Sequence, residues 1–308
     1  MHKTGFLYDD IFLKHEMPPG HPERKERLTA ILAGLEHAPF RNDLLHIPPR
    51  KASFEDISRV HTAPYIEKIK RFGSGYLDGD TFMSENSLEA ALHAAGAVME
   101  AVDRCKSGEI ERAFCAVRPP GHHAEAGRAM GFCIFNNVAV GARYAQKIGY
   151  KKIFIIDFDV HHGNGTQHIF EEDDTVFYFS THQIPLYPGT GYPEERGRGK
   201  GEGYTYNVPM PPGSGDKEFY AVYSEILPPL MEPFRPDIVL VSAGYDIHVN
   251  DPLASLQVTG EGLRNIVHNI VCCPLESGPV PFVFTLEGGY NLSALSEGVS
   301  ITIEELLK

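Results

Sequence analysis

The chain has 308 residues, of which 42% are hydrophobic and 22% are charged, a composition typical of a globular protein with a substantial core. Its formal net charge of −13 argues against a nucleic-acid groove, because phosphate binding needs clustered lysine and arginine. The N-terminus lacks the apolar segment of a secretory signal, and no apolar run approaches the roughly 18 residues of a membrane span.

The cysteines indicate a reducing compartment. Five are present and none forms a CxxC pair: Cys105, Cys115, Cys133, Cys272 and Cys273. An odd number of thiols without a secretory segment is typical of reduced cysteines. We therefore expect a soluble, cytoplasmic protein with no membrane partner.

Short apolar runs rich in β-branched residues alternate along the chain with stretches of helical periodicity. The runs predict strands at residues 113–117, 152–156, 175–179, 238–241 and 281–286. The intervening stretches predict helices at about 87–105, 136–148, 217–231 and 260–271. Strands that are apolar on both sides are typical of a parallel sheet covered on both faces. We expect an α/β fold with a central parallel sheet and helices on both faces.

The organisation predicts a single domain over residues 1–308, since the chain has no internal repeat, low-complexity tract or convincing linker. Three long loops, at 14–26, 71–86 and 183–203, are rich in glycine, proline and charge. Loops of this length within a compact domain are usually functional, although some are only solvated surface.

Polar motifs follow four of the predicted strands. They are Arg118–His123, Asp157–Gly165, Ser242–Asp246 and Glu287–Tyr290. Open parallel sheets bind ligands beyond the carboxyl ends of their strands. The candidate site residues are therefore expected at one edge of the sheet.

The run after the strand at 152–156 predicts a metal site. Asp157, Asp159 and His161 are spaced by two, so on an extended strand they would converge on one side. Two carboxylates and an imidazole suit a divalent cation such as Zn²⁺. The alternative is that an aspartate after a strand caps the next helix. Three potential metal ligands within five residues disfavour that alternative.

Asp246 closes an apolar strand and offers a further ligand. With Asp159 and His161 it would form a site with positions open for water and substrate, as catalytic zinc sites have. A turn-capping role for Asp246 is the alternative.

Three more residues are candidates for catalysis. His122 and His123 follow a Pro-Pro-Gly turn, and a histidine is the natural general base near neutral pH. Tyr290 follows two glycines and could donate its O–H to a developing oxyanion. Each also has a purely structural interpretation, as a hydrogen-bonded buried histidine or a packed tyrosine.

These motifs together resemble the zinc-dependent histone deacetylase family. The matching segments are RPPGHH at 118–123, GFCIFNN at 131–137, DFDVHHGNGT at 157–166, AGYD at 243–246 with DPLA at 251–254, and LEGGYN at 286–291. The resemblance extends from about residue 20 to the end of the chain. It implies the arginase-like α/β fold, a class II-like member, zinc, and structural K⁺.

The resemblance assigns roles to particular residues. Asp159, His161 and Asp246 match the zinc ligands, His123 the general base and acid, and His122 its electrostatic partner.

Three further positions complete the implied catalytic set. Asp157 matches the carboxylate that pairs with His122, and Tyr290 the hydroxyl that polarises the carbonyl. Asn164 stands behind the second histidine where some relatives have aspartate, and a neutral partner stabilises an imidazolium less than a carboxylate does.

The family also implies two monovalent-cation sites. The first maps to Asp157, Asp159, His161, Ser180 and Thr181, and the second near Phe170, Asp173, Val176 and Tyr204.

The implied substrate is held by a narrow tunnel. Phe132 and Tyr187 match the aromatic pair that forms its walls, and Gly131 is a further substrate-binding position. Asp80 resembles the carboxylate at its rim that grips the substrate backbone. Leu253 falls where polyamine-deacetylating relatives carry an acidic residue. Because an apolar side chain cannot pair with a distant ammonium, acyl-lysine in a peptide is favoured over an acetylpolyamine.

The expected activity is hydrolysis of acetyl-lysine or related acyl-lysine amides to the free amine and acetate. Small acetylated amines are the alternative substrates. Two other functions are weighed: a binuclear manganese hydrolase on the same fold, and a non-catalytic acyl-lysine reader. The first needs more bridging carboxylates than a run with Gly163 and Asn164 offers, and the second would lack a site residue. The physiological substrate, the acyl-chain preference and the oligomeric state are left open.

Overall fold

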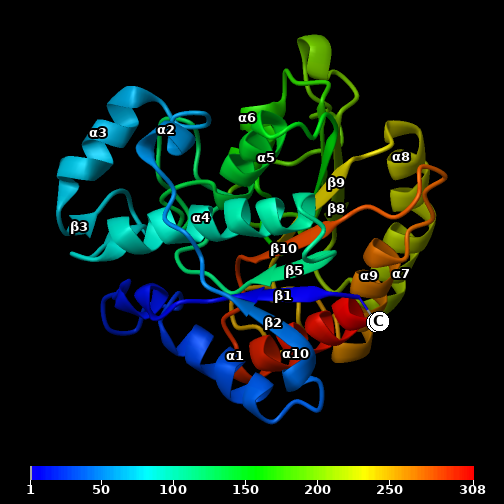
Figure 1. Cartoon of the computed structure of the whole chain (residues 1–308), viewed down its shortest axis with the longest axis horizontal. Coiled ribbons are helices and arrows are strands. Elements are labelled where there is room, and N and C mark those ends of the chain that lie inside the picture. The colour runs from blue at the N-terminus through cyan, green and yellow to red at the C-terminus, as the bar shows by residue number, and fades with distance from the viewer. Residues whose placement is uncertain (1) are drawn as a thin grey trace.

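A computed structural model describes residues 2–308, and its centre is an eight-stranded sheet in which all neighbouring strands are parallel (Figure 1). In spatial order the strands are β2 (Leu44–Ile47), β1 (Thr4–Leu7), β5 (Arg112–Cys115), β10 (Phe282–Leu286), β9 (Ile238–Ala243), β6 (Ile153–Asp157), β7 (Val176–Gln183) and β8 (Thr205–Met210). Every residue of β6 and β9 is buried, as expected for strands that are covered on both sides.

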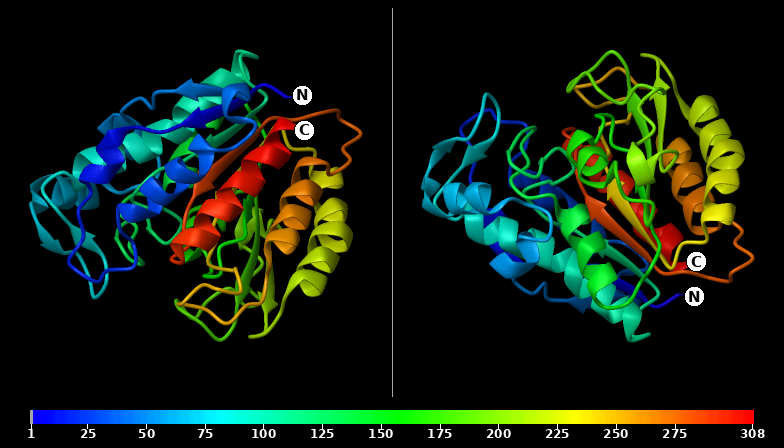
Figure 2. Two further views of the ribbon diagram at one scale, coloured as in Figure 1. Left: turned by 90° about the horizontal axis from the view of Figure 1, so that it is seen from below. Right: turned by 90° about the horizontal axis from the view of Figure 1, so that it is seen from above.

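Helices cover both faces of this sheet. One face is covered by α4 (Ser87–Lys106), α5 (Asn137–Lys147) and α6 (Asn164–Phe170). The other is covered by α1 (Glu26–Glu36), α7 (Asp216–Ala221), α8 (Leu227–Phe234), α9 (Gly260–Val271) and α10 (Leu292–Leu307), and α10, α9 and α7 lie side by side in Figure 2. The prediction of a parallel sheet between two helical layers is confirmed.

The remaining elements lie outside these layers. They are the short helices α2 (Phe54–Ile57) and α3 (Ala63–Phe72), the hairpin of β3 (Gly75–Tyr76) and β4 (Phe82–Met83), the 3₁₀ turns η1 (Asp10–Lys14), η2 (Arg41–Asp43) and η3 (Gly199–Gly201), and the π-helical turn η4 (Val222–Ile226). The hairpin and η3 lie within two of the loops that the sequence predicted as long and irregular.

All five predicted strands are present within a few residues of their predicted bounds, but three strands of the eight-stranded sheet are missed, as are the two short strands of the hairpin. β1 and β2 have only four residues each, and β2 exposes its two central ones. β8 contains Pro209 and is half-exposed; as an edge strand it tolerates a residue without an N–H donor. These three strands lack the long apolar runs that identified the others.

The helix predicted at 217–231 is not continuous. It divides into α7, the turn η4 and α8. Pro228 and Pro229 stand at the start of α8, and since proline has no N–H to donate, the regular helical hydrogen-bond pattern cannot pass through them.

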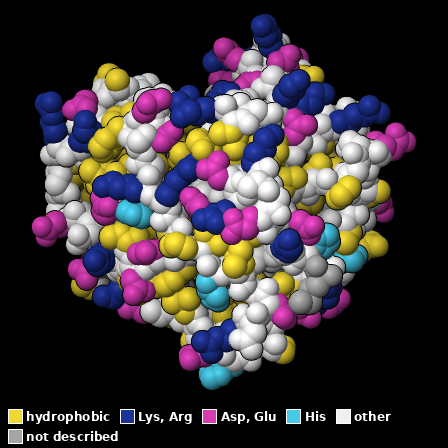
Figure 3. All heavy atoms as spheres, in the orientation of Figure 1, with side chains coloured by type: hydrophobic (Ala, Val, Ile, Leu, Met, Phe, Trp, Pro, Cys, Tyr) yellow, Lys and Arg dark blue, Asp and Glu magenta, His cyan; other side chains and the backbone are white. Residues whose placement is uncertain are grey.

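The surface carries charges of both signs. On the face shown in Figure 3, Lys and Arg side chains are interspersed with Asp and Glu. Among the residues that the structure describes, no helix combines the length and the apolarity required to cross a membrane.

The carboxyl ends of β5, β6, β9 and β10 lie at the same edge of the sheet, because these strands are parallel and adjacent. Asp157 pairs in register with Ser242 on β9 and with Ser180 on β7. The polar motifs after these strands are therefore brought together, as predicted.

Truncating a leucine in the central strand should be far more damaging than truncating one at the edge. Leu240 on β9 is fully buried, whereas Leu45 on β2 is 42% exposed. We expect Leu240→Ala to lower the free energy of unfolding by about 2–5 kcal/mol, because it leaves a cavity. The matched variant Leu45→Ala should change it by less than about 0.5 kcal/mol in urea unfolding. Equal losses would contradict the burial assigned to β9.

Candidate active site

Three of the predicted metal ligands form one cluster at the carboxyl edge of the sheet. Asp159 and His161 lie in the loop after β6, and Asp246 lies in the loop after β9. Nδ1 of His161 is 3.0 Å from Oδ1 of Asp159 and 3.1 Å from Oδ2 of Asp246. The ligand atoms of all three residues lie within 4.8 Å of one another, so a single ion could contact all of them.

Burial makes the charge of this cluster costly. Burial, with the charge of Asp159 adding to it, raises the pKa of Asp246 to about 7. Burial opposes a charge on His161, but the two carboxylates outweigh it and raise the pKa of that imidazole to about 10. Oδ2 of Asp246 is buried without a hydrogen-bond partner among residues 2–308, although Nδ1 of His161 is near.

The donor set fits a divalent metal. Two carboxylates and one imidazole are ligands that Zn²⁺ accepts, and three protein ligands leave a position for water or substrate. The buried, unpartnered oxygen of Asp246 is the kind of group that a bound cation would satisfy.

Glycines allow the chain to approach these carboxylates closely. A Cβ on Gly288 would lie 2.1 Å from Oδ2 of Asp246, and a Cβ on Gly244 would lie 2.1 Å from Oδ2 of Asp159. The N–H of Gly288 donates to Oδ2 of Asp159 at 2.8 Å. Any side chain at either position would displace a candidate ligand.

The two predicted catalytic histidines are buried next to this cluster, and each is held by its predicted partner. Nδ1 of His122 is 3.0 Å from Oδ2 of Asp157, and Nδ1 of His123 is 2.8 Å from Oδ1 of Asn164. The two ring centroids are 4.0 Å apart.

The environment gives the two histidines different charges: His122 is cationic and His123 is neutral. Burial disfavours a charge on His122, yet Asp157 and Asp159 outweigh it and raise the pKa to about 10. Burial lowers the pKa of His123 well below its usual value, and the positive charges of His122 and His161 add to this effect. At neutral pH the pair therefore contains one imidazolium and one neutral imidazole, which is able to accept a proton.

Tyr290 is fixed from two sides. Its backbone N–H donates to Oδ2 of Asp251 at 2.7 Å. The guanidinium of Arg27 lies over its ring, 5.2 Å from the centroid, and donates to the carbonyl oxygen of Gly289 at 2.7 Å. Burial, with the charge of Asp246 adding to it, raises the pKa of the phenol well above its usual value. The hydroxyl therefore keeps its proton and can donate it in a hydrogen bond.

Aromatic side chains border the site. The ring of Phe132 is 6.0 Å from that of Tyr290, and the ring of Tyr187 is 5.2 Å from that of His123. Gly131 precedes Phe132 with a positive φ of 57°, and a Cβ there would lie 2.3 Å from Cδ2 of His123. Phe132 and Tyr187 thus border the site, and their role as tunnel walls stays a prediction.

The two predicted rim residues lie next to these elements. Phe132 N–H donates to Oγ1 of Thr81, which donates to Oδ1 of Asp80, so Asp80 is tied to the Phe132 wall. Leu253 is exposed, and its N–H donates to Oδ1 of Asp251, the residue that also holds Tyr290.

The predicted monovalent-cation sites stay predictions. In the first, Ser180 lies beside Asp157 in the strand register and its Oγ contacts Nδ1 of His182, while Thr181 Oγ1 contacts the hydroxyl of Tyr223.

In the second site, the carbonyl oxygen of Phe170 accepts a hydrogen bond from the N–H of Asp173, and the carbonyl oxygen of Tyr204 accepts one from the N–H of Tyr178. The Asp173 carboxylate pairs with Arg143, and Val176 is the first residue of β7.

One expectation is wrong in its geometry. Strand β6 ends at Asp157, so the alternation of side chains that was expected to align Asp157, Asp159 and His161 stops there. Asp157 instead faces His122 and accepts from the hydroxyl of Tyr178 at 3.2 Å. The third member of the cluster is Asp246, as the alternative grouping proposed.

Several supporting residues were not identified from the sequence. Oε2 of Glu287 accepts from the N–H groups of Gly121 and His122, at 2.7 and 3.2 Å, and so orients the histidine pair. Glu287 and Asp251 lie inside motifs that were recognised, so an acidic residue within each motif was the available signal. Arg27 had no signal, since it reaches the site only through tertiary packing.

Comparisons with known proteins agree on one family. A model of the histone deacetylase domain matches residues 21–306. A probable deacetylase of Archaeoglobus fulgidus is 43% identical over 293 residues, covering 94% of this chain and 82% of that protein. Histone deacetylase 14, chloroplastic, of Arabidopsis thaliana is 44% identical over 308 residues, covering 93% and 73%. The crystal structure of the HDA15 HD domain superposes with a TM-score of 0.93 at 38% identity, covering 99% of this chain and 88% of the other.

A buried ion pair beneath the site gives a test of its support. Glu23 is fully buried between Arg118 and Arg27, with Oε2 2.8 Å from Nη2 of Arg118 and Oε1 3.2 Å from Nη1 of Arg27. We expect Glu23→Gln to lower the free energy of unfolding by about 3–5 kcal/mol, because it leaves the arginine charges uncompensated.

The matched control is Glu16→Gln, which removes an exposed pair with Lys25. Its unfolding midpoint should stay close to that of the parent protein, as is usual for surface pairs. Similar midpoints for the two variants in thermal or urea unfolding would show that Glu23 does not compensate the arginines.

Proposed function

The chain belongs to the histone deacetylase family, which implies deacetylase activity, and we propose more specifically that it is a zinc-dependent amidohydrolase of acetyl-lysine in proteins or peptides. The observation that carries the proposal is the cluster of Asp159, His161 and Asp246 beside a neutral His123. A metal-ligand set and a proton acceptor within one buried site are the parts that amide hydrolysis needs.

Asp159, His161 and Asp246 would hold the zinc, which when bound supplies Lewis-acid activation of the amide carbonyl and of the attacking water. His123 removes the water's proton. Its Nδ1 faces the carbonyl oxygen of the Asn164 side chain, which can only accept, so Nδ1 carries the hydrogen and Nε2 is free to take the proton.

The orientation of the Asn164 amide is fixed by a second contact. Its Nδ2 donates to Oε1 of Glu125 at 2.5 Å, which leaves Oδ1 directed at His123. Asn164 therefore selects the tautomer of His123 without adding a negative charge that would raise its pKa. The neighbouring imidazolium of His122 offsets the negative charge that develops during attack.

Tyr290 acts on the carbonyl oxygen of the substrate. As the carbonyl oxygen gains negative charge during attack, the protonated phenol donates a hydrogen bond to it. The C–N bond then breaks, and the proton held by His123 passes to the leaving nitrogen. The second proton of the attacking water also passes to the amine, so the products are acetate and a lysine ammonium, and atoms and charge balance with one water consumed.

The surroundings of the site favour an acyl-lysine side chain. Phe132 and Tyr187 would offer aromatic walls to an aliphatic stem, and Asp80, which is tied to Phe132 through Thr81, would accept hydrogen bonds from a peptide backbone. Leu253 offers no charge to a distant ammonium, which disfavours acetylpolyamines. Small acetylated amines are the second candidate class of substrate, since the exposed Leu253 does not block them.

We also propose structural K⁺ at the site that includes Asp157 and Ser180.

Chelation should abolish turnover reversibly. We expect release of free amine from an acetyl-lysine peptide to stop after zinc is removed and to return when about one equivalent of Zn²⁺ per chain is added, because three ligands define one site. Acetylputrescine and acetylspermidine should be poorer substrates by kcat/KM. Turnover that resists chelation, or that returns only with two Mn²⁺ per chain, would refute the zinc mechanism; faster turnover of an acetylpolyamine would move the proposal to the second substrate class.

Removing the hydroxyl of Tyr290 should slow the chemical step. We expect Tyr290→Phe to lower kcat by about 10²–10³-fold with a small change in KM, as for the loss of one oxyanion donor. The control is Tyr192→Phe, since Tyr192 is an exposed tyrosine. Near-parental kcat in Tyr290→Phe would exclude this role for the hydroxyl.

A further inference from the structure

A cleft lies at the opposite edge of the sheet from the candidate active site. It is formed where β5 and β10 begin, between the C-terminal ends of α4 and α9 and the segment 274–281 that leads into β10. Its volume is ≈ 490 Å³, within the range of about 300–1,000 Å³ that small-molecule sites occupy.

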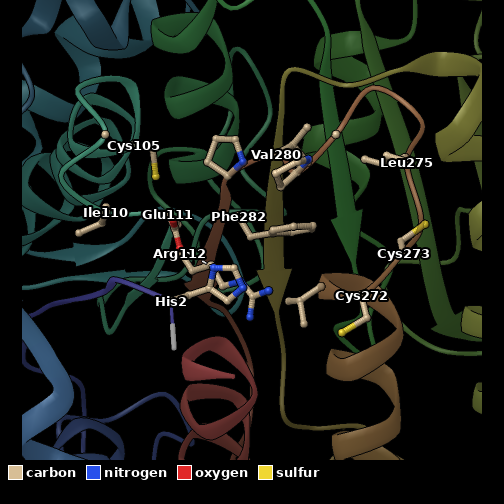
Figure 4. A pocket seen from close by; sticks show the side chains of 15 residues that line it. His2, Cys105, Ile110, Glu111, Arg112, Cys272, Cys273, Leu275, Val280 and Phe282 are labelled. Atoms are coloured by element: carbon tan, nitrogen blue, oxygen red, sulfur yellow. Dashed lines mark hydrogen bonds and ion pairs between the residues drawn. The ribbon is translucent and has the colours of Figure 1, made fainter.

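Most of the cleft is apolar. Ile110, Val271, Leu275, Val280 and Phe282 contribute hydrocarbon or aromatic surface. Figure 4 shows Val280 and Phe282 near the centre of the view, Cys272 and Cys273 on the side of α9, and His2 and Arg112 below. An apolar wall with one cationic group is suited to a ligand with an apolar body and an anionic head.

Arg112 is the cationic group, and its donors are only partly used. The residue is 7% exposed, and its Nη1 donates to the carbonyl oxygens of Glu305 and Leu306 at the end of α10, at 3.0 and 3.2 Å. Within residues 2–308 it forms no ion pair with a carboxylate, and its Nε and Nη2 make no hydrogen bond.

The nearby carboxylates are engaged elsewhere. Glu111 contacts Nδ1 of His2, and Glu305 pairs with Arg264 at 2.8 Å and with Lys308 at 2.6 Å. Burial lowers the pKa of Arg112, which is the effect of a charge that lacks full compensation. The guanidinium therefore has two free donor nitrogens beside an apolar cleft.

We propose that this cleft binds a small aliphatic monocarboxylate, with its chain against Val280 and Phe282 and its carboxylate on Arg112. The planar guanidinium matches a carboxylate in shape as well as charge. Glu111 also lines the cleft, and its negative charge disfavours ligands with a second anionic group.

The chain carries its own reporter of occupancy. Cys272 is exposed and Cys273 is partly exposed, and both line the cleft, whereas Cys105, Cys115 and Cys133 are buried. The rate at which Cys272 and Cys273 react with N-ethylmaleimide, read by mass spectrometry of the peptide that contains them, is therefore local to this cleft. Carboxylate bound at the candidate active site would not change it.

The test compares octanoate with octylamine and octanol as probes on the whole protein. We expect octanoate to slow alkylation of Cys272 and Cys273 in a saturable way and the two other probes to protect far less. In Arg112→Gln the octanoate concentration for half protection should rise about tenfold or more, as for loss of a charge-assisted hydrogen bond. Arg198→Gln, at an exposed arginine paired with Glu171 and Glu172, is the matched control and should protect as the parent does.

A second variant keeps the test decisive if Arg112→Gln does not fold. Val280→Trp should fill the cleft and abolish protection, and its indole, the only tryptophan in the chain, reports by its emission whether it is buried there. No protection of the parent protein by octanoate, equal protection by octylamine, or unchanged protection in folded Arg112→Gln or Val280→Trp would overturn the proposal.

Discussion

The rest of the structure depends on the burial of negative charge at one edge of a parallel sheet. Asp157, Asp159, Asp246 and Glu287 are all inaccessible to solvent. An isolated buried carboxylate is strongly unfavourable, so each must be compensated. Asp157 is paired with His122, and Glu287 accepts backbone N–H groups, but within residues 2–308 Asp246 keeps a buried oxygen without a partner. A bound divalent cation is the group that would compensate it.

The same charges give two adjacent histidines different functions. His122 lies close to Asp157 and Asp159 and takes up a proton. Nδ1 of His123 instead faces the neutral amide of Asn164, and burial and the positive charges of His122 and His161 keep this ring neutral. Groups of the same type whose pKa values are driven apart are typical of sites that handle protons. Burial, with the charge of Asp246 adding to it, keeps Tyr290 protonated, so burial and the buried charges together set the states of all three groups.

How far the sequence predicts this site depends on whether a feature is local. Asp159, His161, the histidine pair and Tyr290 stand in short motifs after apolar strands, and parallel strands bring those motifs to one edge. The expected convergence of Asp157 with Asp159 and His161 was wrong because β6 ends at Asp157, which a run of alternating polar residues does not indicate, whereas its pairing with His122 was implied by the resemblance.

Contacts between residues that are far apart in the chain could not be predicted from the sequence. Arg27 extends from α1 to the carbonyl oxygen of Gly289, 262 residues away, and no local pattern predicts such a contact. In the fold, the long apolar strands were evident, but β1 and β8 were not, because one is too short and the other is interrupted by Pro209.

The most direct test of the account is anomalous diffraction at the zinc edge from crystals of the protein. One peak about 2.0–2.2 Å from ligand atoms of Asp159, His161 and Asp246 is expected; two peaks there, or a single peak elsewhere, would contradict it.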